Sequence, residues 1–246
     1  MKPLTNKVAI VTGASRSIGR AIAERLAQDG ATVAINYRSG ADEAKEVIES
    51  ITSQGGVAIP IQADVSQVSD IRRLFQTVID QLGQLDILVN NAGIARAALV
   101  SEVTEEDYEA VFGINVRGVL FCLQEAARQM SDNGRIVNVS SSTSVFPSPG
   151  LAVYAASKAA EKLFTEVLAK ELGGRGITVN SVLPGPTSPG MFDSVSAENK
   201  QAAAMSSPFG RLGQPEDIAD VVAFLVSEQA RWITGQHILA NGGATI

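Results

Sequence analysis

Tyr154 and Lys158 are the residue pair whose types and spacing most directly suggest chemistry. They are four residues apart at the start of an expected helix, so both side chains lie on one face of it. A phenol ionises near pH 10 in model compounds, and an ammonium group within about 4 to 6 Å lowers such a value by about 1 to 3 units. A helix N-terminus acts in the same direction. The pair therefore suits proton transfer near neutral pH, although most such pairs occupy helix surfaces.

Ser141 gives this pair a context. It follows the apolar run Ile136 to Val139 and precedes Tyr154 by thirteen residues. Open α/β sheets bind ligands at the carboxyl ends of their parallel strands. A serine hydroxyl at such an end can hold a substrate oxygen by a hydrogen bond while Tyr154 supplies the proton.

A glycine-rich turn, Thr12 to Gly19, follows the first apolar run and precedes an amphipathic stretch. Such a turn lets backbone N–H groups approach a pyrophosphate at a helix N-terminus. Roughly twenty residues on, where an acid would hold the ribose 2′-hydroxyl of NAD, the sequence Asn36 to Ser39 contains no acid. Arg16 and Arg38 favour the 2′-phosphate of NADP(H) instead, unless both are solvated surface residues.

Short apolar runs alternate with amphipathic stretches along the whole chain. Expected strands are 8–11, 32–36, 57–62, 87–90, 136–139, 178–183 and 237–240, and expected helices are 18–29, 41–54, 67–82, 104–130, 152–173 and 215–228. This alternation predicts an α/β fold, a parallel sheet with helices on both faces. At 246 residues, one domain spanning 1–246 is favoured. The irregular segment Pro184 to Gly210, with four prolines, is expected to be a substrate lid.

The composition narrows the function class. Twenty Lys and Arg against 26 Asp and Glu give a net charge of −6, which disfavours a nucleic-acid partner. One cysteine, Cys122, and one histidine, His237, leave no common metal site. No apolar run approaches the 18 or more residues of a membrane span, and residues 1–7 lack a signal-peptide core. A cytoplasmic protein is expected, with Cys122 an inert core residue.

Further motifs occur in a characteristic order and spacing. They are Asn90-Asn91-Ala92-Gly93 after the fourth expected strand, Asn115, Pro184-Gly185, Thr234-Gly235-Gln236 and Gly242-Gly243. Together with the glycine-rich turn, Ser141 and the Tyr154–Lys158 pair, they make the chain resemble the short-chain dehydrogenase/reductase family, with its 3-oxoacyl reductases as the nearest subgroup. The resemblance covers essentially the whole length and implies a Rossmann-type, doubly wound sheet of seven parallel strands.

The resemblance also implies roles for individual residues. The catalytic set would be Asn115, Ser141, Tyr154 and Lys158, with Lys158 also touching the nicotinamide ribose and Asn115 anchoring a water. Asp64 would contact the adenine, unless it serves only as a helix N-terminal acid. Residues implied to bind NADP(H), besides Tyr154 and Lys158, are Gly13, Ser15, Arg16, Ser17, Ile18, Gly19, Arg38, Ser39, Asp64, Val65, Asn91, Ala92, Gly93, Pro184, Gly185 and Thr187.

Two positions depart from the family pattern. Ser17 replaces the usual middle glycine of the turn, and Pro189 replaces a threonine that commonly contacts the nicotinamide amide. Thr187 or Ser188 is expected to compensate for the second change. Neither departure removes a catalytic group.

The expected reaction is NADPH-dependent reduction of a carbonyl compound to an alcohol. The 3-oxoacyl reductases often carry a pair of basic residues that dock an acidic carrier protein. Here the sequence Ser131-Asp132-Asn133 stands where one of the pair is expected, and only Arg175 remains. A small or medium apolar ketone or aldehyde is therefore favoured. The expected substrate pocket is Ile94, Phe146, Pro186, Met191 and Phe192.

Three alternatives stay open. They are a 3-oxoacyl thioester reductase, an NAD-linked alcohol or sugar dehydrogenase, and a catalytically idle NADP-binding sensor. The resemblance and the small residues Ala155, Ala156, Ala159 and Ala160 predict a homotetramer, with interfaces on helices 104–130 and 152–173.

Overall fold

Seven parallel strands form one sheet in the order β3-β2-β1-β4-β5-β6-β7. The computed structural model describes residues 2–244. The strands are β1 Val8–Val11, β2 Thr32–Tyr37, β3 Val57–Gln62, β4 Ile87–Asn90, β5 Arg135–Val139, β6 Thr178–Pro184 and β7 His237–Ala240. The strand order reverses between β1 and β4, which creates a crevice at the carboxyl ends of these two strands. The predicted doubly wound, seven-stranded fold is confirmed.

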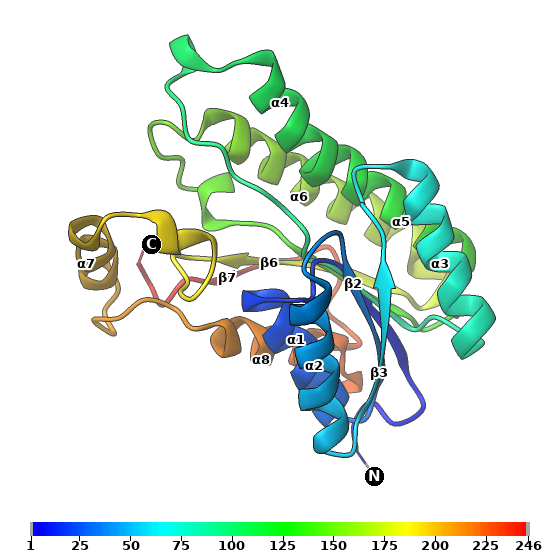
Figure 1. Cartoon of the computed structure of the whole chain (residues 1–246). Helices are drawn as coiled ribbons and strands as arrows, with labels where there is room; N and C mark the ends of the chain where they lie inside the picture. Colours follow the sequence, from blue (N-terminus) through cyan, green and yellow to red (C-terminus); the bar gives the residue numbers. More distant parts are fainter. Residues whose placement is uncertain (1, 245–246) are drawn as a thin grey trace.

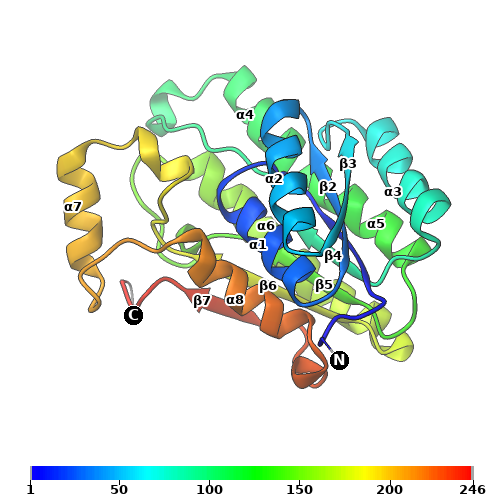
Figure 2. The same cartoon turned by 60° about the horizontal axis from the view of Figure 1, so that its bottom comes forward.

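Helices cover both faces of the sheet (Figure 1). On one face lie α1 Ser17–Gln28, α2 Ala41–Ser53 and α8 Pro215–Val226, which come forward in Figure 2. On the other lie α3 Val68–Leu82, α4 Glu105–Phe112, α5 Val119–Gln129 and α6 Ala152–Leu172. Short single-turn helices are η1 Val100–Glu102, η3 Ser142–Ser144, η4 Gly173–Arg175, η5 Met191–Ser194 and η6 Glu228–Ala230, and a π-helical segment, η2 Gly113–Gly118, joins α4 to α5.

Alternate residues of the central strands enter two separate cores. On β1, Ala9 and Val11 pack toward α1 and α8, whereas Val8 and Ile10 pack toward α3 and α5. Successive strand side chains point to opposite faces, so a strand covered on both sides must be apolar throughout. All four residues of β1 are buried for this reason.

The segment after β6 differs from its prediction. Residues 184–210 were expected to be irregular, but they contain η5 and a further helix, α7 Ala197–Ser206. Ser196 begins α7 because its hydroxyl accepts the N–H of Asn199. Both views show α7 projecting from the body of the molecule on the side of β6 and β7 (Figure 1, Figure 2).

A second difference concerns the continuous helical run Glu105–Gln129. Its length and composition would allow it to cross a membrane, whereas the sequence was expected to hold no run of that kind. Of its most apolar window, 56% is buried inside the fold, as in a core helix. Cys122 lies on this run, and burial raises the pKa of its thiol to about 12, with Glu125 adding to the effect. The thiol therefore stays protonated at neutral pH, as expected of an inert core residue.

Candidate active site

The turn between β1 and α1 leaves room for a phosphate group against its backbone. Gly13 has φ +63°, a conformation that L side chains rarely adopt. A Cβ on Gly19 would lie 2.3 Å from the Gly13 carbonyl oxygen and 2.5 Å from the Asn91 amide nitrogen. That amide holds the turn by donating to the carbonyls of Thr12 and Gly13. Among the described residues, no side chain caps the N-terminus of α1, so its N–H groups are available to an anion, and the turn fits a dinucleotide pyrophosphate.

The carboxyl end of β2 carries Asn36, whose buried amide is fully engaged. It donates to the carbonyls of Ile61 and Ala63, and its oxygen accepts the N–H of Gly13. Asn36 therefore ties β2 to β3 and to the glycine-rich turn. The next polar positions, Arg38 and Ser39, are exposed.

Arg38 and Asp64 line one open hollow of about 530 Å³, together with Gln62 and Arg73. One oxygen of Asp64 accepts the N–H of Ser66 in the turn before α3, so the structural role considered for this acid is present. Arg16, before α1, is exposed and is not among the residues that line this hollow.

Asn115 lies on the π-helical segment η2, a type of irregularity that often occurs at functional sites. Its amide nitrogen donates to the Ile94 carbonyl and to the Ser157 hydroxyl, and its oxygen accepts the Ile94 N–H. These bonds join η2 to the end of β4 and to α6. A Cβ on Gly93 would lie 3.3 Å from the Asn115 oxygen and 3.4 Å from Lys158 Nζ, so Asn115 and Lys158 meet at Gly93.

Lys158 is buried on α6 and points toward the end of β5. Its Nζ donates to the Val139 carbonyl at 2.9 Å and to the Glu161 carboxylate at 2.7 Å. The same nitrogen lies 6.0 Å from the centroid of the Tyr154 ring. Burial alone would lower the pKa of Lys158, but the Glu161 carboxylate and Tyr154 raise it overall. Lys158 is therefore an ammonium at physiological pH.

Ser141 follows β5, and its hydroxyl oxygen accepts two hydrogen bonds from Thr143, one from the backbone N–H at 3.2 Å and one from the hydroxyl at 2.9 Å. Within residues 2–244, no acceptor takes the Ser141 hydroxyl proton. The Ser141 O–H is consequently free to donate to a substrate oxygen.

Comparisons with known proteins identify the family of this chain. A family model described as enoyl-(acyl carrier protein) reductase matches residues 13–245. An uncharacterized oxidoreductase of Methylorubrum extorquens is 47% identical over 246 residues, 99% of each chain. A 3-oxoacyl-[acyl-carrier-protein] reductase of Staphylococcus aureus is 44% identical over 239 residues, 96% of this chain and 97% of the relative. The chain belongs to the short-chain dehydrogenase/reductase family.

Solved structures of other proteins share the fold of this short-chain dehydrogenase/reductase. The angucycline C-6 ketoreductase LanV with bound NADP has a TM-score of 0.94 and 44% identity, covering 98% of this chain and 96% of its own. A short-chain dehydrogenase from Burkholderia cenocepacia in complex with NADP has a TM-score of 0.94 and 43% identity, covering 98% and 99%. The chain is thus an oxidoreductase by family and by fold.

Of the residues expected to bind substrate in this short-chain dehydrogenase/reductase, Pro186 lines a cavity near the end of β6. Pro186 and Thr187 line a cavity of about 170 Å³ between the end of β6 and the start of α8. Ile94, Phe146 and the pair Met191–Phe192 are not among the residues that line this cavity. Met191 is 53% exposed on η5.

Sequence reasoning missed several polar residues around the site. Thr143 and Ser157 orient Ser141 and Asn115, and Glu161 pairs with Lys158. Glu161 had a readable signal, because an acid three residues after a lysine shares its helix face. Thr143 and Ser157 had none, because serine and threonine are common on helices and turns whatever they contact.

Proposed function

We propose that this short-chain dehydrogenase/reductase uses NADPH to reduce the carbonyl group of a small or medium-sized apolar compound to an alcohol. One observation carries the proposal. The Lys158 ammonium lies beside Gly93 and 6.0 Å from the centroid of the Tyr154 ring, and Ser141 follows β5 with an O–H that no acceptor takes within residues 2–244. This group set can donate two hydrogen bonds and one proton to a carbonyl oxygen.

The side chains divide the work between them. Ser141 holds the carbonyl oxygen by a hydrogen bond, and the Tyr154 hydroxyl transfers its proton to that oxygen. NADPH, when bound, supplies the hydride for the carbonyl carbon. Lys158 stabilises the phenolate left on Tyr154, because an adjacent ammonium favours the charged form. Asn115 fixes Ile94 and Ser157, and so holds η2, β4 and α6 in register around Lys158.

The preference for NADPH rests on the end of β2. No carboxylate stands between Asn36 and Ser39 to accept a ribose 2′-hydroxyl, and the exposed Arg38 lines the neighbouring hollow. Arg16, at the start of α1, would join Arg38 on the 2′-phosphate. The other residues inferred from the sequence to bind the cofactor support this proposal, since they end or follow β1, β2, β3, β4 and β6, except Tyr154 and Lys158, which lie on α6.

A small substrate is favoured over a carrier-bound one because Arg175 is already engaged. Its guanidinium pairs with Asp132 at 2.8 Å and donates to the carbonyls of Ala127 and Met130. It is therefore not free to dock an acidic carrier protein, and the net charge of −6 opposes such a partner. The 44% identity to a 3-oxoacyl-[acyl-carrier-protein] reductase makes a β-keto thioester the second candidate.

Residues 184–210 are assigned as the substrate lid. Asp193 organises its first half, because its carboxylate accepts the Ser188 hydroxyl and the Gly190 N–H, both at 2.7 Å. These bonds, the Ser188 hydroxyl first, hold the pKa of Asp193 below its usual value. The exposed Met191 supplies apolar area that closure over a ligand would bury.

The assembly is proposed to be a homotetramer in the cytoplasm. Large apolar side chains are exposed on the outer side of three packed helices: Tyr108 on α4, Leu120 on α5, and Leu163 and Val167 on α6. Leu163 is 62% exposed, and such a patch on a helix layer is typical of a two-fold interface. The cytoplasmic location fits a reductase with a single buried cysteine.

The experiment that tests the proposed function is an NADPH oxidation assay. The protein is incubated with NADPH and a panel of ketones, aldehydes and β-keto thioesters, and the loss of nicotinamide absorbance is followed. Fastest turnover of apolar ketones or aldehydes is the expected result. Preference for the thioesters would transfer the assignment to the second candidate, and no turnover of any compound would reject carbonyl reduction.

A further inference from the structure

Glu161 is a buried acid that the catalytic scheme above does not use. It lies three residues after Lys158 on α6, and its side chain is 1% exposed. One carboxylate oxygen is 2.7 Å from Lys158 Nζ. The other is buried and has no hydrogen-bond partner among residues 2–244. An ionisable group so close to a proposed catalytic ammonium must affect the charge that this ammonium presents.

The fold itself gains little from this carboxylate. Burying a carboxylate costs free energy unless its oxygens are satisfied, and one oxygen of Glu161 is not. An apolar side chain of similar size would fill the same space at lower cost. The position of Glu161 is therefore better explained by its effect on Lys158 than by a contribution to stability.

Lys158 stands between the acid and the proposed proton donor. Of its three N–H donors, one is used by the Val139 carbonyl and one by Glu161, which leaves one for the side of Tyr154 and the cofactor ribose. The ammonium is 6.0 Å from the Tyr154 ring centroid. Tyr154, which is half-buried, and the buried Lys158 and Glu161 thus form a row of three ionisable groups along one face of α6.

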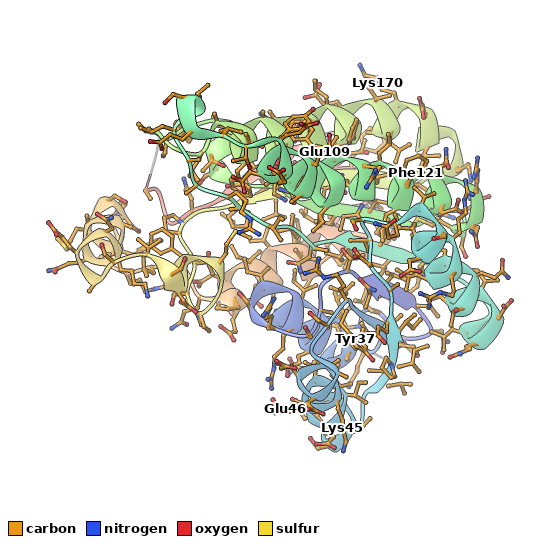
Figure 3. The ribbon with its side chains drawn as sticks, turned by 45° about the horizontal axis from the view of Figure 1, so that its top comes forward. Tyr37, Lys45, Glu46, Glu109, Phe121 and Lys170 are labelled. Carbon is orange, nitrogen blue, oxygen red and sulfur yellow. The ribbon has the colours of Figure 1, made fainter. Side chains whose placement is uncertain are left out.

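No other charged group shares this environment within the described residues. α6 packs against β6, η2, η3, η4, α4 and α5. Arg175 of η4 is paired with Asp132. β6 and η3 carry no ionisable side chain, and Arg117 of η2 donates to the Ser66 carbonyl. Glu125 and Arg128 of α5 pair with each other, and the acids of α4, Glu105, Glu106, Asp107 and Glu109, are exposed or half-buried. Lys170 on α6 extends away from the molecule (Figure 3).

We propose that Glu161 is a positioning residue that neutralises the Lys158 ammonium, so that the Tyr154 phenol keeps its proton at neutral pH and the site is biased toward carbonyl reduction. The inference rests on the proposed function. An unneutralised ammonium beside a phenol favours the phenolate, which accepts a proton from an alcohol and so serves oxidation. A neutralised one keeps the phenol protonated, as reduction requires. In reduction the carbonyl oxygen takes the phenol proton and the carbonyl carbon takes the hydride of NADPH, which leaves NADP⁺, and solvent returns a proton to the phenolate.

The acid–base behaviour of the pair agrees with this. Burial raises the pKa of Glu161 to about 7, although the neighbouring ammonium opposes the rise. Since the folded-state value lies above the ordinary one, Glu161 ionises as the pH passes about 7. The negative charge of Glu161 is therefore present above about pH 7.

The test compares Glu161→Gln, which keeps the hydrogen bond to Lys158 but removes the charge, with Glu161→Leu, which removes both. Glu171→Gln, an exposed acid on the same helix, is the matched control. Values of kcat/KM are measured against pH for carbonyl reduction with NADPH and for oxidation of the product alcohol with NADP⁺. For both Glu161 variants, kcat/KM for reduction should begin to fall at a lower pH than in the wild type, by about 1 unit or more. The rise of kcat/KM for oxidation should move to lower pH by the same amount. Glu171→Gln should follow the wild type.

A second readout does not depend on turnover. The chain has three tyrosines, so the difference between the tyrosinate absorbance of each protein and that of its Tyr154→Phe counterpart isolates Tyr154. Its midpoint should fall by about 1 unit or more in both Glu161 variants. If wild-type protein reduces no carbonyl compound, the proposed function fails while this titration still decides the inference. The proposal would be overturned if the Tyr154 midpoint stayed unchanged in Glu161→Gln or shifted only in Glu161→Leu. It would also be overturned if both variants unfolded. In each case Glu161 would be a structural residue.

Discussion

The Ser17 hydroxyl donates a hydrogen bond of 2.6 Å to the carbonyl oxygen of Pro189. Both residues are departures from the family pattern, and the bond joins the glycine-rich turn to the proposed lid. Ser17 is held at φ +49°, a conformation that costs a non-glycine residue about 1 kcal/mol or more. The contact is close, since a Cβ on Gly190 would lie against the same hydroxyl. The two departures are therefore one structural feature, a link between the cofactor turn and the lid.

Breaking this link should loosen the lid without removing a catalytic group. Ser17→Ala and Ser17→Gly both remove the hydroxyl, so both should raise hydrogen exchange in residues 186–195 relative to wild type. Ser17→Gly should melt above Ser17→Ala by a few degrees, because glycine tolerates a positive φ. Exchange that stays at the wild-type level in both variants would show that the bond does not hold the lid.

Tyr154→Phe should lower turnover by a hundredfold or more while NADPH binding stays near the wild-type value. The substitution removes the transferable proton and keeps the ring, and general acid catalysis supplies about 10² to 10⁴ in rate. Lys158→Ala should lose both activity and cofactor affinity, because Lys158 is proposed both to assist Tyr154 and to contact the nicotinamide ribose. It should also lower stability, because it leaves Glu161 buried without its ionic partner. Steady-state rates and fluorescence titration with NADPH measure the two effects. A Tyr154→Phe protein with more than about a hundredth of wild-type activity would contradict the assigned acid.

NADPH should exceed NADH in kcat/KM by at least about tenfold. One charge-assisted hydrogen bond to the 2′-phosphate, worth about 1.5 to 3 kcal/mol, suffices for this ratio. The effect should appear mainly in the KM for the cofactor, because the phosphate is remote from the reacting carbon. Arg38→Asp should invert the preference by setting a like charge against the phosphate, and Arg73→Asp tests whether the other arginine of the hollow takes part. Equal use of both cofactors by the wild type would make Arg16 and Arg38 ordinary surface residues.

Light scattering should give the mass of a tetramer at micromolar concentration. A charge on the α6 patch should split the assembly, so Leu163→Glu should lower the measured mass by half or more. Val57→Glu on the edge strand β3 is the control, because Val57 is also exposed, at 54%, but lies outside the proposed interface. A monomer mass for the wild type would reject the tetramer.

Element boundaries followed closely from local patterns where burial was strong. Strands such as Val8–Val11 and Ile87–Asn90 were predicted at their observed limits, because residues buried on both faces leave an unbroken apolar run. α7 was not predicted, since its weakly apolar, alanine-rich sequence has no buried face and resembles a loop. The π-helical turn at Asn115 was also missed, because an irregularity within a helix leaves no change in apolar spacing.

The sequence by itself determined the sheet, the glycine-rich turn and the identity of the proposed catalytic residues. The strands and the turn can be recognised from residue types within short segments of the chain. Because the strands are parallel, the carboxyl ends of all of them lie at one edge of the sheet, where the proposed catalytic residues gather. Only the tertiary structure decided which neighbours surround those residues: that Thr143 leaves the Ser141 proton free, that Arg175 is occupied by backbone carbonyls, and that Ser17 binds Pro189. Such contacts depend on distance and burial between segments far apart in the chain, and a residue's type does not specify its partner. The charge on Lys158 is set in the same way, because only folding removes Glu161 from water and leaves the ammonium as its one ionic partner within residues 2–244.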